Sequence, residues 1–86
     1  MEKILIIGSA GQIGSELTME LRGIYGNDNV IASGPKTMPS ETVLNSGPWE
    51  ICDATDKESV IRVVDQYGVD VIINMAAILS ATGEQN

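Results

Sequence analysis

Residues 4–17 have the sequence ILIIGSAGQIGSEL, and this stretch decides the fold. Four apolar residues end at Gly8, and two further glycines follow at intervals of three residues, at Gly11 and Gly14. A short apolar run bounded by glycine is typical of a strand that is buried on both faces of a sheet. The mixed polar and apolar residues after it favour a helix. The stretch therefore predicts a strand, a tight turn and a helix in direct succession.

The helix predicted after the glycines runs from about residue 12 to residue 25 and is amphipathic. Its apolar residues recur at intervals of four, four and three, which places them in one stripe: Ile13, Leu17, Leu21 and Ile24. Glu16, Glu20 and Arg22 lie off this stripe. The stripe is therefore the expected contact between helix and sheet.

The rest of the chain repeats the alternation of strands and helices. Short strands are predicted at residues 30–32, 50–52 and 71–73, with a loop over residues 34–48 in which Val43 and Leu44 could pair briefly. A capping box, with Thr55 as the cap and Glu58 reaching back to it, opens a second helix. The apolar face of this helix is formed by Val60, Val63, Val64 and Tyr67, and Gly68 ends it.

The resulting order of elements, β-α-β-β-α-β, places residues 1–86 in the α/β class as one domain. Buried strands that alternate with amphipathic helices form a parallel sheet with right-handed crossovers. This sheet is incomplete at its C-terminus, because the last strand has no further neighbour and leaves an apolar edge that invites aggregation. We therefore expect either a fragment of a longer protein or a partner that covers this edge.

Composition excludes several classes of function. Twelve acidic and five basic residues give a formal net charge of −7, which argues against a nucleic acid or an anionic membrane as partner. The chain has no histidine and one cysteine, Cys52, so it predicts no zinc site and no disulfide, and Cys52 is expected to be a small buried residue. The apolar run after Met1 is too short for a signal peptide or a membrane span, which predicts a soluble, cytoplasmic protein.

The three glycines have a common explanation in phosphate binding. A helix that starts directly after a strand directs unpaired amides and the positive end of its dipole into the turn, where phosphate binds. Gly8 would permit the tight turn, Gly11 would admit a pyrophosphate, and Gly14 would allow the helix to pack close to the sheet. First-turn amides would come from Gln12 and Ile13. The context predicts a partial Rossmann fold that binds a dinucleotide, although a merely structural turn is the alternative.

The spacing Gly-x-x-Gly-x-x-Gly resembles that of the extended short-chain dehydrogenases and reductases. The stretches GSAGQIGSEL, IYGNDNVIAS, LNSGPWEICDATD and NMAAILSATGE together resemble the N-terminal part of the short-chain type of L-threonine 3-dehydrogenase, a relative of the nucleotide-sugar 4-epimerases. The resemblance extends from Lys3 to Glu84. It implies an NAD-dependent oxidoreductase of threonine catabolism, whose complete form acts on a small-molecule substrate and is a homo-oligomer.

The resemblance also implies roles for individual residues. The pyrophosphate and ribose would be held by Gly8, Ala10, Gly11, Gln12 and Ile13. Asp53 would accept a hydrogen bond from the adenine amino group, with Ala54 beside the ring. The path to the nicotinamide would be lined by Met75, Ala76, Ala77 and Leu79, and Ser80 would lie near the substrate. Three of these roles have a purely structural alternative: Asp53 could cap a loop, residues 75–79 could pack in the core, and Ser80 could be an ordinary loop hydroxyl.

One departure from the family pattern concerns the choice of cofactor. An acidic residue about 20 positions after the last glycine normally binds the adenosine ribose, and the family has Asp there. This sequence has Gly34, followed by Pro35 and Lys36. NAD is the expected cofactor from the resemblance, whereas NADP is the rival, because Lys36 could attract a 2′-phosphate. The structural alternative for Lys36 is a solvated charge.

A second departure concerns catalysis. Short-chain dehydrogenases use a Tyr-x-x-x-Lys pair, but Tyr25 is followed four positions later by Asn29, and Tyr67 by Val71. No catalytic residue is therefore assigned. The alternatives are part of a nucleotide-sugar epimerase or dehydratase and a non-catalytic dinucleotide-binding module. Residues 1–86 alone are expected to bind the cofactor weakly at best.

Overall fold

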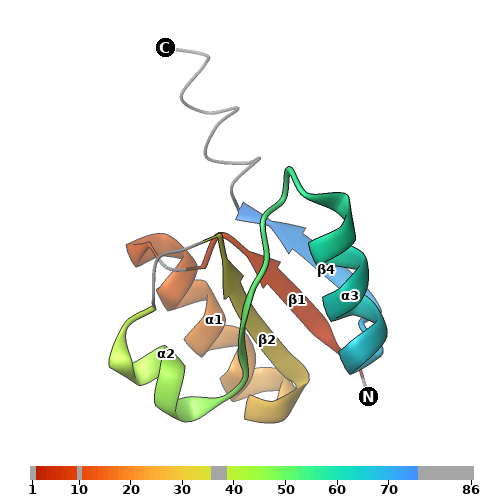
Figure 1. Ribbon diagram of the computed structural model, residues 1–86. Helices are drawn as coiled ribbons and strands as arrows, with labels where there is room; N and C mark the ends of the chain where they lie inside the picture. Colours follow the sequence, from red (N-terminus) through yellow and green to blue (C-terminus); the bar gives the residue numbers. More distant parts are fainter. Residues whose placement is uncertain (1, 10, 36–38, 76–86) are drawn as a thin grey trace, which may run out of the picture.

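The computed structural model describes residues 2–9, 11–35 and 39–75. Its elements in chain order are β1 (Ile4–Ile7), α1 (Gln12–Tyr25), a 3-10 turn (Asn27–Asn29), β2 (Val30–Gly34), α2 (Glu41–Ser46), β3 (Trp49–Ile51), α3 (Lys57–Tyr67) and β4 (Val71–Asn74) (Figure 1). The predicted alternation of strands and helices is confirmed. The bounds predicted for the first helix coincide with those of α1.

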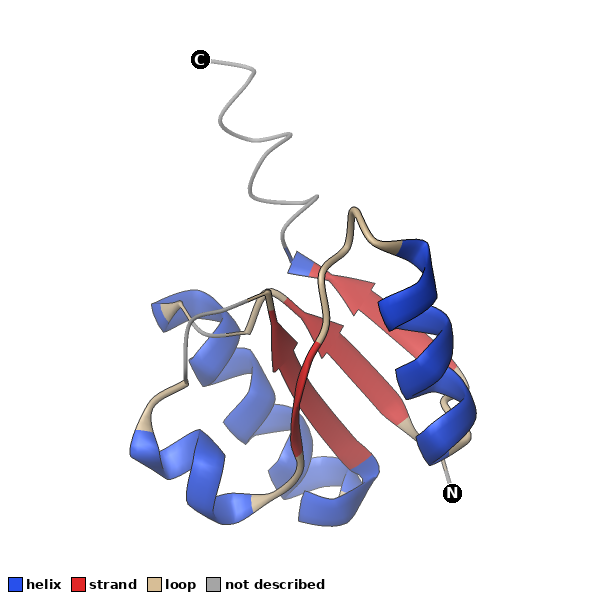
Figure 2. Cartoon of the chain, viewed as in Figure 1, coloured by secondary structure: helices blue, strands red, loops and turns tan. Residues whose placement is uncertain are grey.

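The four strands form one parallel sheet in the order β3-β2-β1-β4. The central pair, β1 and β2, is in register from Ile4 beside Val30 to Ile7 beside Ser33. Because all strands are parallel, their carboxyl ends meet at one edge of the sheet, and α1 begins at this edge (Figure 2). The class is α/β and the fold is a partial Rossmann-like one, as the sequence predicts.

The apolar run of β1 supplies both halves of the core, because successive side chains of a strand point to opposite faces. On one face Ile4, Ile6 and Val30 pack against α1 through Leu17, Leu21 and Tyr25. On the other face Leu5, Ile7 and Ile31 pack against α3, with Val63 and Cys52 in the same cluster. Each of these buried aliphatic side chains contributes about 1.5–3 kcal/mol of hydrophobic stabilisation. The buried Cys52 matches its expected role.

The contact face of α1 differs from the predicted stripe. Ile13 and Ile24 are 58% and 70% exposed, whereas Arg22 is 2% exposed. The helix is rotated so that its sheet side carries Leu17, Leu21 and Tyr25 together with two polar residues. Thr18 can be buried there because its hydroxyl donates to the carbonyl of Gly14 at 2.7 Å. The spacing of apolar residues predicts the wrong contact face, because it cannot identify a polar side chain that is buried with its hydrogen bonds satisfied.

Arg22 can be buried because hydrogen bonds to acceptors in three segments of the protein replace the hydrogen bonds that its guanidinium would make to water. It donates to the carbonyls of Val30 (3.1 Å), Val43 (2.7 Å) and Pro48 (2.7 Å) and to the Ser46 hydroxyl (2.9 Å). Burial lowers the pKa of Arg22, and the charge of Asp28 partly opposes this shift. The side chain thereby joins α1, the start of β2, α2 and the segment that enters β3.

Gly47 lies close to this guanidinium. A Cβ atom on Gly47 would be 2.8 Å from both Cζ and Nε of Arg22 and 2.6 Å from the carbonyl oxygen of Asn27. The stretch Ser46-Gly47-Pro48 therefore has a structural role: it supplies two acceptors to Arg22 and the only residue type that fits between them.

Two local predictions are wrong. Val43 and Leu44 belong to helix α2 and not to a strand pair: the Ser40 hydroxyl caps α2 by accepting from the Val43 amide, and the Val43 side chain is buried. Helix α3 is capped by Asp56, whose carboxylate accepts from the Glu58 amide, and not by Thr55. Thr55 is instead hydrogen-bonded to Asp53 in the preceding loop. The N-cap therefore lies one residue later than predicted.

The third and fourth strands also differ from expectation. The third strand spans Trp49–Ile51 and not 50–52, although the Cys52 amide still donates to the carbonyl of Gly34 at 2.9 Å. The fourth was expected to be buried in character, yet Val71 and Ile72 are 37% and 48% exposed. The reason is position, because β4 lies at the edge of the described sheet and pairs only with β1 there.

Candidate functional site

The candidate site is the turn between β1 and α1, at the carboxyl edge of the sheet. Gly8 has a φ of +84°, a backbone conformation that L side chains rarely adopt. Its amide and that of Ser9 both donate to the carbonyl of Ser33 at 2.9 Å. The first glycine therefore makes the tight turn that the sequence predicts, and the turn is held against the end of β2.

Gly14 allows a close approach of backbone to backbone. A Cβ atom there would be 2.6 Å from the Cα of Ser9 and 2.8 Å from the carbonyl oxygen of Gly8, closer than real Cβ atoms come. The third glycine thus packs α1 onto the turn. Sequence analysis predicted this close packing but assigned it to the sheet.

Gly11 has no such intramolecular reason to be glycine. Its φ of −76° and ψ of 174° suit any residue, and a Cβ atom there would meet nothing within 4 Å. The residue is exposed at the N-cap of α1. The open space beside it is what a ligand that approaches the main chain requires.

The N-terminus of α1 carries no side-chain cap. Gly11 provides no side-chain hydrogen bond to the first turn, and no acidic residue lies in that turn. The following residues, Gln12 and Ile13, are exposed, and first-turn amides have no acceptor within their own helix. With the positive end of the helix dipole, these amides suit an anion such as a pyrophosphate.

Two buried serines of this site were missed by sequence analysis. The Ser9 hydroxyl accepts from the Ser33 amide (2.8 Å) and donates to the Ser33 carbonyl (3.0 Å). The Ser33 hydroxyl donates to the carbonyl of Ile6 at 2.8 Å. Both residues are fully buried. Only the ordinary abundance of serine in turns could have drawn attention to Ser9.

The end of β2 has the departure that the sequence predicts. Gly34 is the last residue of β2, is buried, and stands beside Ile51 of β3. It brings no carboxylate to the position where the adenosine ribose is normally bound. Lys36, the alternative contact for a 2′-phosphate, lies outside the described residues, as do Ala10, Ala76, Ala77, Leu79 and Ser80.

Asp53 lies in the loop after β3 and is bound to that loop. Its Oδ1 atom accepts from the amide (2.9 Å) and the hydroxyl (2.8 Å) of Thr55, and its own amide donates to the Ser59 hydroxyl (3.1 Å). The neighbouring Ala54 packs against the core cluster of α3. This arrangement matches the loop-capping alternative, and the adenine contact stays a prediction.

Met75 and Cys52 are both buried. Met75, 6% exposed, belongs to the apolar cluster beneath α1, which matches its core alternative; a contact with the nicotinamide path stays a prediction. Burial raises the pKa of the Cys52 thiol, so the thiolate that a nucleophile needs is disfavoured. Neither side chain offers chemistry at the glycine turn.

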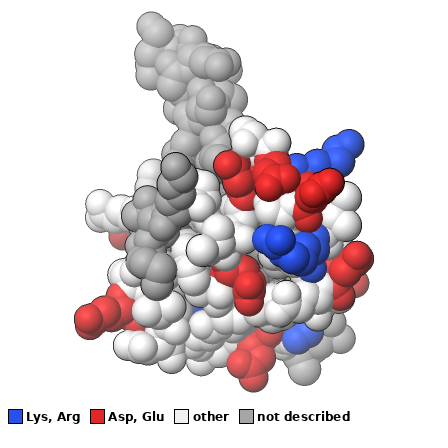
Figure 3. All heavy atoms as spheres, viewed as in Figure 1, with Lys and Arg blue, Asp and Glu red and all other residues white. Residues whose placement is uncertain are grey.

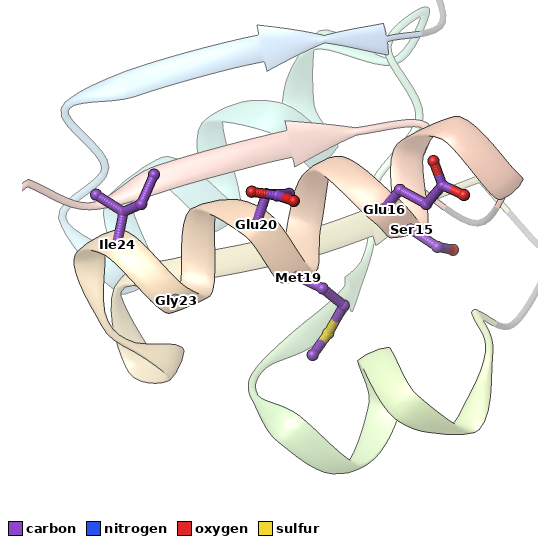
Figure 4. Close-up of a pocket in the computed structure, with 6 residues that line it drawn as sticks. All are labelled: Ser15, Glu16, Met19, Glu20, Gly23 and Ile24. Carbon is purple, nitrogen blue, oxygen red and sulfur yellow. The ribbon is translucent and has the colours of Figure 1, made fainter.

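A hollow of the described surface lies outside the glycine turn. This open hollow runs along the outer flank of α1 and is lined by Ser15, Glu16, Met19, Glu20, Gly23 and Ile24 (Figure 4). Its two carboxylates disfavour a phosphate, so it is not the candidate site. Acidic side chains are spread over the face in Figure 3 with a few Lys and Arg among them.

The described residues contain neither a cluster of metal-ligating side chains nor a membrane-spanning helix. In the ranges that the structure describes, no three or more His, Cys, Asp or Glu side chains gather as metal ligands. Among these same residues no helix is long and apolar enough to cross a membrane.

The residues at the turn fit the pyrophosphate of a dinucleotide. A tight turn through Gly8 delivers the chain to an uncapped helix N-terminus, and the space beside Gly11 is open. At this edge the carboxylate of Asp53 is bound to Thr55 in its own loop. The arrangement therefore suits the pyrophosphate of a dinucleotide.

Comparison with curated proteins gives relatives along the whole chain. It is 44% identical over 86 residues to an uncharacterized epimerase/dehydratase of Staphylococcus haemolyticus and 43% identical to one of Staphylococcus aureus. In both cases the match covers 100% of this chain and 27% of the relative. The chain thus spans about a quarter of the length of these relatives.

Among solved structures, L-threonine dehydrogenases are similar to this chain. The enzyme from Clostridium difficile is 50% identical with a TM-score of 0.78, covering 86% of this chain and 23% of that one. The GalE-like enzyme from Cupriavidus necator, in its holo form, is 41% identical with a TM-score of 0.79, covering 96% and 26%. The model of the NAD dependent epimerase/dehydratase family matches residues 4–86. The chain therefore belongs to the NAD dependent epimerase/dehydratase family.

Proposed function

We propose that residues 1–86 are the dinucleotide-binding N-terminal part of an NAD-dependent L-threonine 3-dehydrogenase. The observation that carries the proposal is Gly11: a glycine with an ordinary backbone conformation, open space beside it and no cap for the helix that it precedes. Such a residue is explained by a ligand that must approach the main chain. The likeness to L-threonine dehydrogenases at 50% and 41% identity supports the substrate.

In this function each part of the site has a defined task. The turn and the first-turn amides would bind the pyrophosphate of NAD, which would supply the hydride acceptor for oxidation of the β-hydroxyl of threonine to 2-amino-3-oxobutanoate. Asp53 and Ala54 would contact the adenine. The nicotinamide path and substrate contact are proposed for Met75, Ala76, Ala77, Leu79 and Ser80. The 86 residues contain no Tyr-x-x-x-Lys pair, so the proton transfer belongs to another part of the enzyme.

NAD is the proposed cofactor, with NADP as the rival. Gly34 supplies no carboxylate that would bind the ribose hydroxyls or repel a 2′-phosphate. Titration of both dinucleotides decides between them, and a preference for NADP of tenfold or more, about 1.4 kcal/mol, would overturn the choice of NAD. We also propose that the enzyme works in the cytoplasm and assembles as a homo-oligomer.

The binding function is tested with a pair of matched substitutions on one helix. Gly11→Ala places a methyl group in the open space where the pyrophosphate is proposed to lie, and Gly23→Ala places one in open space near the other end of α1. We expect Gly11→Ala to weaken NAD binding in calorimetry at least tenfold, which is about 1.4 kcal/mol, while Gly23→Ala leaves it unchanged. Equal affinities for both variants would contradict the proposal.

The substrate is tested on the polypeptide as its source organism makes it, whose intact mass is the first measurement. NAD reduction with L-threonine supports the dehydrogenase. Turnover of a nucleotide sugar without threonine oxidation would favour the second candidate, an epimerase or dehydratase, which the two staphylococcal relatives make a specific alternative. Dinucleotide binding without turnover of either substrate would point to a non-catalytic binding module.

A further inference from the structure

Ser9 and Ser33 form the best-defined polar contact at the carboxyl edge of the sheet. Both are fully buried, and they lie 24 residues apart in the sequence. The Ser9 hydroxyl is used in both directions, as acceptor for the Ser33 amide and as donor to the Ser33 carbonyl. Buried hydroxyl groups are retained only where they are hydrogen-bonded, so this pair fixes one arrangement of the turn.

The Ser33 carbonyl is the acceptor on which the turn depends. It receives three donors: the Gly8 amide (2.9 Å), the Ser9 amide (2.9 Å) and the Ser9 hydroxyl (3.0 Å). The two amides at the start of the turn are thereby directed inward toward β2. They are committed to protein, and a phosphate must be bound by amides further along the chain.

The main chain of Ser9 is held from its other side as well. The Ser15 hydroxyl, from the first turns of α1, donates to the Ser9 carbonyl at 3.2 Å. Gly14 packs its backbone against the Cα of Ser9. Ser9 is therefore fixed between β2 and α1, and its position sets how far the N-terminus of α1 stands from the end of the sheet.

We propose that Ser9 is a positioning residue of the dinucleotide site. Its hydroxyl holds the main chain of Ser33 through the amide and the carbonyl. That carbonyl accepts from the amides of Gly8 and Ser9, which leaves the first-turn amides of Gln12 and Ile13 as the groups that bind the pyrophosphate. This inference rests on the proposed cofactor binding and deepens it. Ser9 acts through the main chain of the turn and does not itself contact the ligand.

The test compares ligands with and without the pyrophosphate. Ser9→Ala deletes the hydroxyl, and Thr18→Val is the matched control, because it deletes another fully buried hydroxyl that bonds only within α1. Both variants are titrated by NMR with ADP-ribose and with adenosine, in the protein as its source makes it. We expect Ser9→Ala to weaken the binding of ADP-ribose roughly tenfold, because the first-turn amides lose their fixed position, and to change the binding of adenosine by less than a factor of two. Thr18→Val changes neither.

Amide hydrogen exchange tests the same inference without a ligand. The amides of Gly8, Ser9 and Ser33 should exchange slowly in the wild type, and that of Ser33 should become fast in Ser9→Ala, because it loses its acceptor. If Ser9→Ala does not fold, Ser9→Cys decides, since it keeps the volume and offers only a weak acceptor.

The outcomes distinguish a failure of the positioning role of Ser9 from a failure of cofactor binding. Equal affinity for ADP-ribose in folded Ser9→Ala and wild type overturns the positioning role and leaves cofactor binding intact. An equal loss of affinity for ADP-ribose and adenosine also overturns it, since the defect is then a general one. A wild type that binds neither NAD nor ADP-ribose overturns the proposed function instead, and fast exchange of the three wild-type amides overturns the positioning role regardless of binding.

Discussion

Nη2 of Arg22 and the carbonyl oxygen of Pro48 lie 2.7 Å apart, which joins the C-terminal half of α1 to the segment just before β3. The same guanidinium binds carbonyl groups of β2 and α2. Arg22 therefore fixes the path of the chain from the end of α2 into β3. Because α2 and β3 are short, they make few contacts of their own, and Arg22 holds the segment between them in place.

Substitution of Arg22 should destabilise the protein strongly. Arg22→Met deletes the guanidinium that donates to three carbonyls and one hydroxyl. The Pro48 carbonyl keeps the Ala32 amide as a donor and the Val43 carbonyl keeps the Ser46 hydroxyl, so we expect a loss of about 1–3 kcal/mol in the free energy of unfolding. Arg22→Lys should be intermediate, because an ammonium lacks the planar fork that reaches several acceptors. Urea denaturation measures both, and Arg62→Met, at an exposed arginine, is the control. An Arg22→Met variant as stable as this control would refute the role.

Alanine substitutions at Gly14 and Gly23 of α1 should change the stability of the protein in opposite directions. At Gly14 a Cβ atom would overlap the backbone of Ser9 and Gly8, so Gly14→Ala should cost ~1–3 kcal/mol or more, as overpacking does. At Gly23 nothing lies within 4 Å, and alanine should stabilise the helix by up to ~1 kcal/mol. Thermal unfolding of the two variants checks the signs. A neutral Gly14→Ala would show that the helix is free to move away from the turn.

Tyr67 should titrate unusually late. Burial, the hydrogen bond to Glu50 and the charge of that carboxylate raise the pKa of Tyr67 to about 12. Because the folded pKa lies above the unfolded value of about 10, the neutral phenol contributes stability that is complete below pH ~10 and is lost as the pH rises through ~12. Ultraviolet titration should assign this late transition to Tyr67 by its absence in Tyr67→Phe.

A second variant tests the cause of the Tyr67 shift. Glu50→Gln removes the charge and should move the transition toward lower pH. The stability difference between wild type and Tyr67→Phe should shrink over the same pH interval. A Tyr67 transition near pH 10 in the folded wild type would contradict the contact with Glu50.

The sequence is sufficient for the parts of this fold that depend on local pattern. The bounds of α1 follow from an apolar strand, a glycine turn and an amphipathic repeat, all within 22 residues. The order of the four strands and of helices α1 and α3 follows in the same way. The turn at Gly8 and the space at Gly11 were predicted because the strand-turn-helix context limits what glycine can do there.

The parts that were missed depend on contacts between distant residues. Helix α2 is short and is held by Arg22, 21 residues from its partner Val43, so no local repeat announces it. The orientation of α1 is set by the burial of Arg22 and Thr18, which hydropathy alone places in solvent. Ser9 and Ser33 are 24 residues apart and become a pair only when β1 and β2 align.

The exposed edge of β4 should promote self-association of the 86-residue chain. Ile72 is 48% exposed on this edge strand, and Ile61 is 50% exposed on α3, so the two form a matched pair of apolar surface residues. An exposed edge strand pairs with other strands, and a lysine on it blocks such pairing. Ile72→Lys should therefore reduce self-association in sedimentation velocity, whereas Ile61→Lys should not, once circular dichroism has shown that both are folded. An equal reduction in both variants would mean that general apolar exposure, and not strand pairing, drives association.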